Sequence, residues 1–202
     1  MPSMKRILKH LLWIVPLIVV IAVVTLVAYA ATARSADATY HSKLQKTIQV
    51  SSKSFENEQE MPLEFSCKGD ARAPDVKWTN PPGNTKSYAL IMMDWDAPSP
   101  SLRLFPIVHW VLYNIPAETT EIPKGSTNAD LGAKKIVPCI NIGGGPGYMA
   151  PCPPLGTHRY EFRVYALDVE QLRPASKNKA DVMKAMEGHI LGYGELAGLK
   201  KL

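Results

Sequence analysis

The sequence predicts a mostly β domain, an antiparallel sandwich or barrel, behind one N-terminal hydrophobic segment. Several apolar runs have the length of a strand rather than of a helix. Stretches rich in proline, glycine and asparagine separate these runs, and the 202 residues include 17 prolines. Once the hydrophobic segment is set aside, the remaining length suits a single domain with one core.

The N-terminal segment is divided into a basic flank, residues 1–10, and an apolar run, residues 11–31. The run carries no charged side chain and as a helix would span about 30 Å, the thickness of a bilayer's hydrocarbon core. Lys5, Arg6 and Lys9 precede it, which predicts a cytoplasmic N-terminus and a domain outside the cytoplasm.

Two interpretations of this segment stay open. It is either an uncleaved single-pass anchor or a signal peptide whose removal leaves a secreted or periplasmic protein, because small residues at 28–33 fit a cleavage site. A buried core helix is the third and weakest interpretation. Residues 32–46 are small and polar and predict a linker, and residues 47–202 form the domain.

Charge argues against one class of partner. The chain carries a net charge of +5, and four basic residues in 1–34, without any acidic residue there, account for most of it. The domain itself is almost neutral, so no nucleic-acid partner is predicted.

The strands are expected in order along the domain. Residues 47–51 are short and β-branched, and residues 88–93 (YALIMM) and 107–115 (IVHWVLYNI) suit strands buried on both faces. Residues 160–167 (YEFRVYAL) alternate between an apolar and a polar face. Their spacing favours antiparallel pairing over alternating strands and helices.

A helix is expected near the C-terminus, over residues 179–190. Apolar side chains recur there at helical spacing, and Asn178 precedes them as a capping residue. The tail, residues 194–200, is expected to add one short turn of helix.

Three segments carry polar side chains that could bind a ligand. Asp94 and Asp96 follow a buried strand and, two residues apart, point to the same side of an extended chain. His109 lies inside an apolar strand, and His158 and Tyr160 share one face after a proline-rich loop. Each signal alone also fits a structural role: a turn, a core histidine or a stiff loop.

Together and in this order, the motifs Asp-x-Asp-Ala-Pro, His-Trp and Pro-Cys-Pro-Pro-x-Gly-…-His-Arg-Tyr resemble the phosphatidylethanolamine-binding protein family, and its bacterial Raf-kinase-inhibitor-like members in particular. The resemblance covers about residues 47–200. It implies a β-sandwich with one or two peripheral C-terminal helices and a small pocket for phosphate-like anions. The implied ligand-binding residues are Asp94, Asp96, Pro98, His109, Pro154, His158 and Tyr160. Trp95 stands where the family usually has proline, and the connection from Pro154 to His158 is short.

The resemblance favours a membrane-tethered binding domain for a phosphate- or carboxylate-bearing ligand, such as a phospholipid head group. Two alternatives remain: a regulator of a partner protein of protease or kinase type, and a hydrolase that uses the Asp and His side chains. No nucleophile motif is present, so we expect no enzymatic activity, no cofactor and no metal. In the anion pocket both histidines are expected to donate hydrogen bonds.

The chain has three cysteines, Cys67, Cys139 and Cys152. Outside the cytoplasm a disulfide would persist, and Cys139–Cys152 is the favoured pair because the two flank the glycine-rich loop. Otherwise the cysteines serve as small buried apolar residues.

Overall fold

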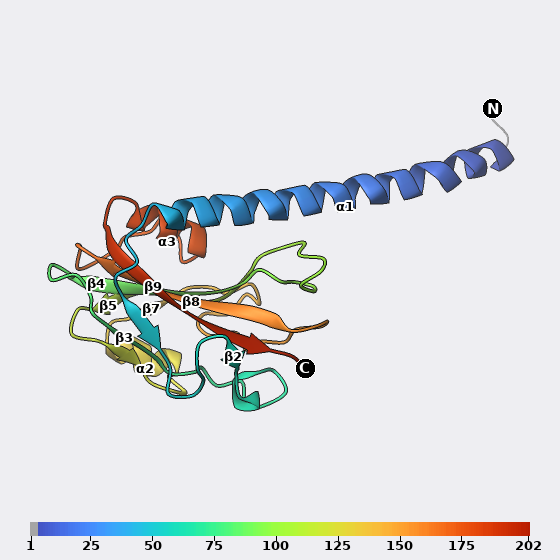
Figure 1. The fold of residues 1–202 in the computed structure, drawn as a ribbon. Helices are drawn as coiled ribbons and strands as arrows, with labels where there is room; N and C mark the ends of the chain where they lie inside the picture. The colour runs from blue at the N-terminus through green and yellow to red at the C-terminus, as the bar shows by residue number, and fades with distance from the viewer. Residues whose placement is uncertain (1–3) are drawn as a thin grey trace.

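A long N-terminal helix projects from a compact β domain (Figure 1). The computed structural model describes residues 4–202, with side chains from residue 12 onward; the side chains of the basic flank 1–10 lie outside this part. Helix α1 (Met4–Ser42) contains Pro16, and every residue from 12 to 29 is exposed. Residues Leu12–Ser42 are long and apolar enough to cross a membrane. The same property fits a signal sequence, so the choice between anchor and signal stays a prediction.

The predicted linker over residues 32–46 is mostly helical instead. Helix α1 continues through Ser42, because its last turns pack on the sheet. Asp37 accepts a 2.6 Å hydrogen bond from Arg163, and the His41 ring is bonded to the Tyr165 hydroxyl at 2.8 Å. These contacts supply tertiary stabilisation that a small, polar sequence does not signal by itself.

The domain contains two sheets, which agrees with the predicted mostly β class. The larger is mixed and has the order β2-β9-β8-β4-β5-β7, with only the β2–β9 pair parallel. Its strands are β2 (Gln59–Glu60), β4 (Ser87–Asp94), β5 (Ile107–Pro116), β7 (Val137–Pro138), β8 (His158–Leu167) and β9 (Ile190–Lys200). The smaller, antiparallel sheet contains β1 (Gln49–Ser51), β3 (Val76–Thr79) and β6 (Glu121–Ile122). Short helical elements are η1 (Leu63–Phe65), α2 (Asn128–Ala133) and α3 (Lys179–Met186).

Strand β4 is the centre of the domain, and all eight of its residues are buried. One of its faces joins a core cluster that includes Trp78 of the smaller sheet, and the other joins a cluster that includes Val182 and Met186 of α3. Burial on both faces explains why β4 and β5 are continuously apolar, as the sequence predicted. In the register Asp94 lies opposite Ile107 and Tyr160, so the polar motifs meet at one end of the sheet.

The C-terminal tail differs from its prediction. Residues 194–200 belong to strand β9 and not to a further turn of helix, and α3 ends at Met186, before Ile190. Glycines explain the difference, because they are poor helix formers and leave room for crossing segments. A Cβ atom at Gly194 would lie 2.1 Å from the Ile48 carbonyl oxygen, and one at Gly198 would lie 2.5 Å from Met61 Cγ.

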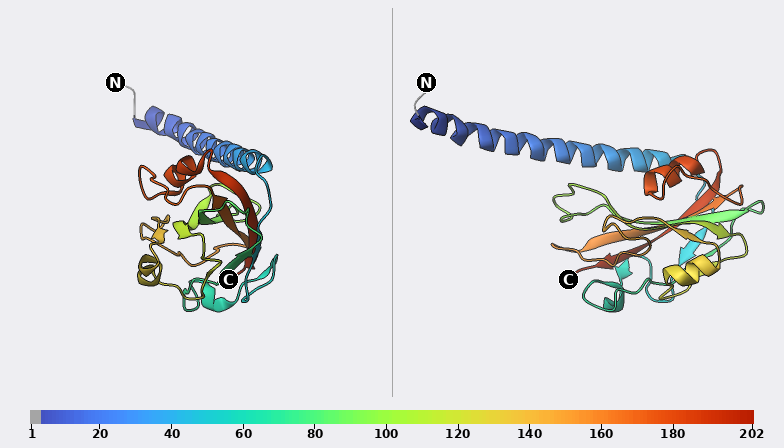
Figure 2. Two further views of the ribbon diagram at one scale, coloured as in Figure 1. Left: turned by 90° about the vertical axis from the view of Figure 1, so that its left-hand side faces the viewer. Right: turned by 180° about the vertical axis from the view of Figure 1, so that it is seen from behind.

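Figure 2 shows from two further sides that α1 runs alongside the domain before it leaves it. The N-terminal part of α1 projects beyond the end of the domain at which β8 begins, and the C-terminus lies at that same end (Figures 1 and 2). The apolar segment of α1 therefore extends toward the end of the large sheet at which β8 begins.

Candidate functional site

A cavity of about 580 Å³ lies at the end of the large sheet where β4 ends and β5 and β8 begin. Six of the seven residues predicted for the pocket line it: Asp94, Pro98, His109, Pro154, His158 and Tyr160. The fold thus brings together side chains that are up to 66 residues apart in the sequence, from Asp94 to Tyr160. Their role in binding a ligand remains a prediction.

His158 and Asp94 form a buried pair in this cavity. His158 Nδ1 lies 2.8 Å from Asp94 Oδ2, and both side chains are almost fully buried. Asp94 Oδ1 also accepts a 2.7 Å hydrogen bond from the backbone N–H of Asp96. The Asp94 carboxylate therefore accepts hydrogen bonds from a histidine and from a backbone amide. Since Nδ1 donates to Asp94, the other ring nitrogen, Nε2, is the atom left for a ligand.

His109 has the opposite hydrogen-bonding capacity. Its Nδ1 lies 2.8 Å from the Met149 carbonyl oxygen, which can only accept, so Nδ1 carries a proton. Burial of the ring lowers the pKa of His109, although the Met149 carbonyl and the Asp94 charge act against it. In the neutral ring Nε2 is then an acceptor. This arrangement favours an acceptor at His109, in place of the donor that the sequence predicted.

Tyr160 lies beside both histidine rings. Its ring is edge-on to His109 at 5.1 Å and stacked with His158 at 6.4 Å between centroids. Burial raises the pKa of the Tyr160 hydroxyl, and the charge of Asp94 raises it further. The hydroxyl therefore stays protonated and can donate to an anion.

Asp96 is the one predicted pocket residue that does not line the cavity. Its Oδ2 accepts a 2.9 Å hydrogen bond from the Arg159 backbone N–H, and its Oδ1 lies 2.9 Å from Arg103 Nε. These bonds tie the loop after β4 to the start of β8. Asp96 thus supports the cavity wall, and its side chain lines the adjacent cleft instead of the cavity.

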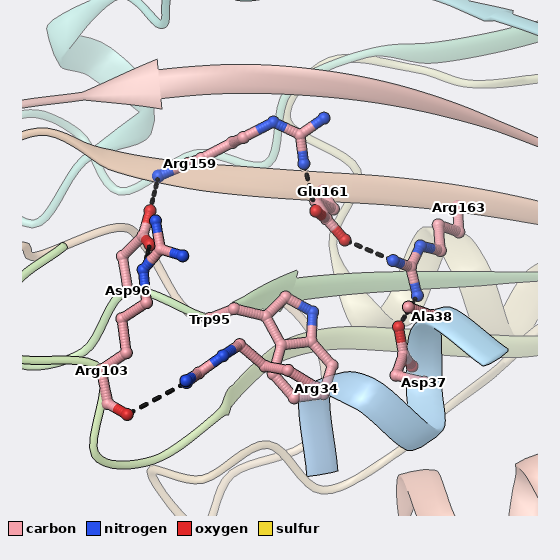
Figure 3. A pocket seen from close by; sticks show the side chains of 9 residues that line it. All are labelled: Arg34, Asp37, Ala38, Trp95, Asp96, Arg103, Arg159, Glu161 and Arg163. Atoms are coloured by element: carbon pink, nitrogen blue, oxygen red, sulfur yellow. Dashed lines mark hydrogen bonds and ion pairs between the residues drawn. The ribbon is translucent and has the colours of Figure 1, made fainter. Parts of the chain in front are cut away.

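Trp95, which stands where the family usually has proline, lies against helix α1. It lines a cleft of about 240 Å³ between α1 and the sheet, together with Arg34 and Ala38 of the helix. Figure 3 shows the Arg34 side chain beside the Trp95 indole and the ion pairs of Arg163 with Glu161 and Asp37. The large ring thus faces the helix, away from the cavity that holds His158.

A disulfide closes part of the cavity wall, but the predicted pair is wrong. Cys67 is bonded to Cys152, with Cα atoms 5.4 Å apart, while Cys139 is free and buried. Cys139 follows β7 and packs in the cluster against α3, on the far side of the sheet from the proline-rich loop. Cys139 and Cys152 are therefore separated, because they lie on opposite faces of the sheet. Their spacing along the sequence does not reveal this.

Sequence reasoning missed the apolar part of the wall. Phe105, Ile107, Ile142 and Met149 line the cavity, and they come from loops and a strand end without any distinctive motif. Single apolar residues in loops are common, so only the fold identifies them as lining residues.

Comparison with known proteins agrees with this architecture. The family model described as phosphatidylethanolamine-binding protein matches residues 51–201. A UPF0098 protein of Methanothermobacter thermautotrophicus is 42% identical over 146 residues, 72% of this chain and 93% of its own length. One from Aquifex aeolicus is 39% identical, over 76% of this chain and 88% of its own.

Solved structures show the same similarity. The crystal structure of a phosphatidylethanolamine-binding protein homologue from Chlamydia trachomatis has a TM-score of 0.69 and 32% identity, and covers 78% of this chain and 99% of that one. Escherichia coli YbcL, described as a new member of the mammalian family, has a TM-score of 0.68 and 28% identity, with coverages of 77% and 99%. The family match begins after α1. From its fold, its motifs and these matches, the chain belongs to the phosphatidylethanolamine-binding protein family.

Proposed function

We propose that this protein is a membrane-anchored domain that binds, without turnover, a ligand with a phosphate or carboxylate group, including a phospholipid head group. The environment of His158 carries the proposal. The side chain is buried, its Nδ1 is bonded to Asp94, and its Nε2 has no hydrogen-bond partner among the residues that the structure describes. A buried ring nitrogen without a partner is costly, and an anionic oxygen would satisfy it.

Protonation of His158 makes it a donor at both nitrogens. The imidazolium would keep its bond to the Asp94 carboxylate and donate from Nε2 to the anion, and a charge-assisted bond is about twice as strong as a neutral one. Tyr160 would add a second donor. The carboxylate of Asp94 offsets the charge of the imidazolium, so the site suits a singly charged group better than a multiply charged one.

The hydrogen-bonding state of His109 narrows the class of ligand that fits the cavity. Its neutral Nε2 accepts a hydrogen bond and repels a bare anionic oxygen. The cavity therefore combines donors at His158 and Tyr160 with an acceptor at His109. A group that has both an anionic oxygen and a donor of its own matches this arrangement, for example a monoprotonated phosphate or a head group that also carries an ammonium.

Binding without turnover is supported by the composition of the wall. Both cysteines that line the cavity, Cys67 and Cys152, are joined in a disulfide, and its other polar side chains are Asp94, His109, His158 and Tyr160. The Tyr160 hydroxyl is held in its protonated form, so it is a poor nucleophile.

The test uses His158→Asn, because an asparagine amide can replace Nδ1 toward Asp94 while it lacks Nε2. Calorimetry with O-phosphoethanolamine and with inorganic phosphate at pH 6 should show at least about a tenfold loss of affinity, the equivalent of one charge-assisted hydrogen bond.

His189→Asn is the matched control. His189 Nδ1 also lies 2.8 Å from a carboxylate, Asp168 Oδ1, but this pair is about 40% exposed and remote from the cavity lining. The control should bind like the parent. Unchanged affinity in His158→Asn at pH 6 would refute the anion site.

A further inference from the structure

The contacts between α1 and β8 define which end of the domain faces the apolar segment. His41 contacts Tyr165 of β8. Asp37, one helical turn before His41, contacts Arg163, which lies two residues before Tyr165 in the strand. Arg34, a further turn back, donates a 3.0 Å hydrogen bond to the Arg103 carbonyl in the loop after β4. The helix and β8 therefore run in the same direction, and the apolar residues of α1 lie toward the cavity end of the sheet.

The lengths of β8 and of the docked helix, both measured back from the Asp37–Arg163 contact, place the cavity level with the last turns of the apolar run. From Arg163 back to His158, β8 covers about 16 Å at the usual strand rise. From Asp37 back to Ala31, the last residue of the run, the helix covers only about 9 Å. Ala30 is 1% exposed, whereas all residues from 12 to 29 are exposed, so the docked part of the helix reaches into the run itself.

The loops around the cavity mouth expose large apolar side chains at this end. Leu102 and Phe105 lie in the loop after β4, and Leu155 lies in the loop before β8, with exposed fractions of 47%, 41% and 64%. The two loops are adjacent, since a Cβ atom at Gly156 would lie 3.1 Å from Pro100. Ile142, which lines the same cavity, is 59% exposed.

Charge at this level also suits a lipid surface. Arg34 is the first charged residue after the apolar run, and it donates to a carbonyl oxygen rather than to a carboxylate. Arginine at the boundary of a membrane-spanning helix places its guanidinium among lipid phosphates. Exposed leucine and phenylalanine beside such a cation form a surface that fits the head-group region of a bilayer.

We infer that the docked end of α1 holds the cavity mouth against the same bilayer that anchors the helix, and that the rim formed by Leu102, Phe105, Ile142 and Leu155 contacts its lipids. The partner of this rim is a phospholipid surface, and the ligand enters the cavity from that surface. This inference rests on the proposed function, in which α1 stays in the membrane.

The test measures how close the rim lies to lipid. The full chain, with Leu102→Cys or Leu155→Cys labelled with a fluorophore, is reconstituted into phosphatidylcholine–phosphatidylglycerol vesicles that contain nitroxide-labelled phospholipid. The native cysteines should stay unlabelled, because Cys67 and Cys152 are bonded and Cys139 is buried. Asn84→Cys is the control, since this exposed residue precedes β4 at the opposite end of that strand from Asp94.

Nitroxide lipid should quench the labels at 102 and 155 at least about twofold more than the label at 84. Equal quenching at all three positions would overturn the inference. With Asp37→Ala and His41→Ala combined, quenching at 102 should fall toward that at 84, whereas Asp70→Ala, which breaks an exposed Asp–Arg pair, should leave it unchanged. Unchanged quenching in the double variant would show that docking of α1 does not hold the rim.

O-phosphoethanolamine binding, measured by calorimetry on the unlabelled parent and His158→Asn, separates the two proposals. Failure of the anion site would abolish the difference between parent and His158→Asn but preserve the quenching pattern. Failure of the present inference would preserve that difference and remove the extra quenching at the rim.

Discussion

His109 and His158 show how two like residues in one cavity acquire different roles from their partners. A carbonyl oxygen fixes the proton of His109 at Nδ1, and burial favours the neutral ring. The Asp94 carboxylate accepts a hydrogen bond from Nδ1 of His158, so Nε2 of this ring is the atom left for a ligand. One histidine is thus suited to accept from a ligand and the other to donate to it.

The lowered pKa of His109 predicts a dependence of stability on pH. The unfolded chain takes up a proton near pH 6.5 while the folded chain resists it, so the free energy of unfolding should decrease as pH falls below about 6.5. This single group contributes at most about 1.4 kcal/mol per pH unit. His109→Asn, which keeps a donor toward Met149, should show a flatter dependence in urea unfolding between pH 7 and 5. Parallel curves for parent and variant would contradict the prediction.

At the scale of elements, the loops around the cavity are held together from outside the sheet. The Cys67–Cys152 disulfide joins the segment after η1 to the proline-rich loop, and the Cys67 backbone N–H also donates to the Pro151 carbonyl at 3.0 Å. Prolines restrict the second loop further. The cavity wall is therefore constrained although its backbone is irregular.

Reduction of this disulfide should lower stability. The bond joins residues 85 positions apart, and loss of such a crosslink costs about 2–4 kcal/mol through the unfolded chain. A lower melting temperature in reductant, and in Cys67→Ser with Cys152→Ser, would confirm this.

Burial raises the pKa of the Cys139 thiol to about 11, so in the oxidised protein it should react with a thiol reagent only after unfolding. Three reactive thiols in the native protein would contradict the pairing.

The end of α1 is fixed by buried polar contacts rather than by apolar packing alone. Burial alone would raise the pKa of Asp37, but the hydrogen bond with His41 and the charge of Arg163 lower it to about 2. Asp37 therefore stays ionised over the physiological range. Buried ion pairs are weak evidence for stability but restrict geometry, because each partner is costly to bury alone. This property suits an element whose role is to set an orientation.

At the scale of the whole molecule, an almost neutral domain is joined to one exposed apolar helix. A large exposed apolar surface is unfavourable in water, so α1 requires an environment that covers it. Anchoring in a bilayer and signal-directed export both meet this requirement, and they differ in whether the full-length chain persists.

Fractionation distinguishes these outcomes. We expect the full-length chain in the membrane pellet after an alkaline carbonate wash and in the soluble fraction only after detergent. Val19→Arg together with Val23→Arg should release it, because each charge near the bilayer centre costs about 2.5–3.5 kcal/mol. A full-length parent found soluble in the cytoplasm would contradict the prediction, and a mature chain that begins within residues 29–34 would establish cleavage instead.

Much of this architecture could be predicted from the sequence. Continuous apolar runs predicted β4 and β5, and alternation predicted β8, since burial on one or both faces leaves a direct pattern. The pocket residues other than Asp96 line one cavity, as the family resemblance implied, and their role in binding stays a prediction. The C-terminal tail could not be predicted well, because its two glycines weaken any periodic signal and are needed only where other segments cross them.

The sequence by itself determined the strand-rich class and the apolar helix, because hydrophobic periodicity is local, and its ordered motifs carried the family resemblance that implied the polar residues of the cavity. Only the tertiary structure decided that Cys67 pairs with Cys152, that Asp96 supports the wall, that Nδ1 of His109 donates to the Met149 carbonyl and that α1 continues to Ser42 and docks on β8. Each of these depends on which groups from distant parts of the chain lie within bonding distance, and that is fixed by packing and not by spacing along the chain.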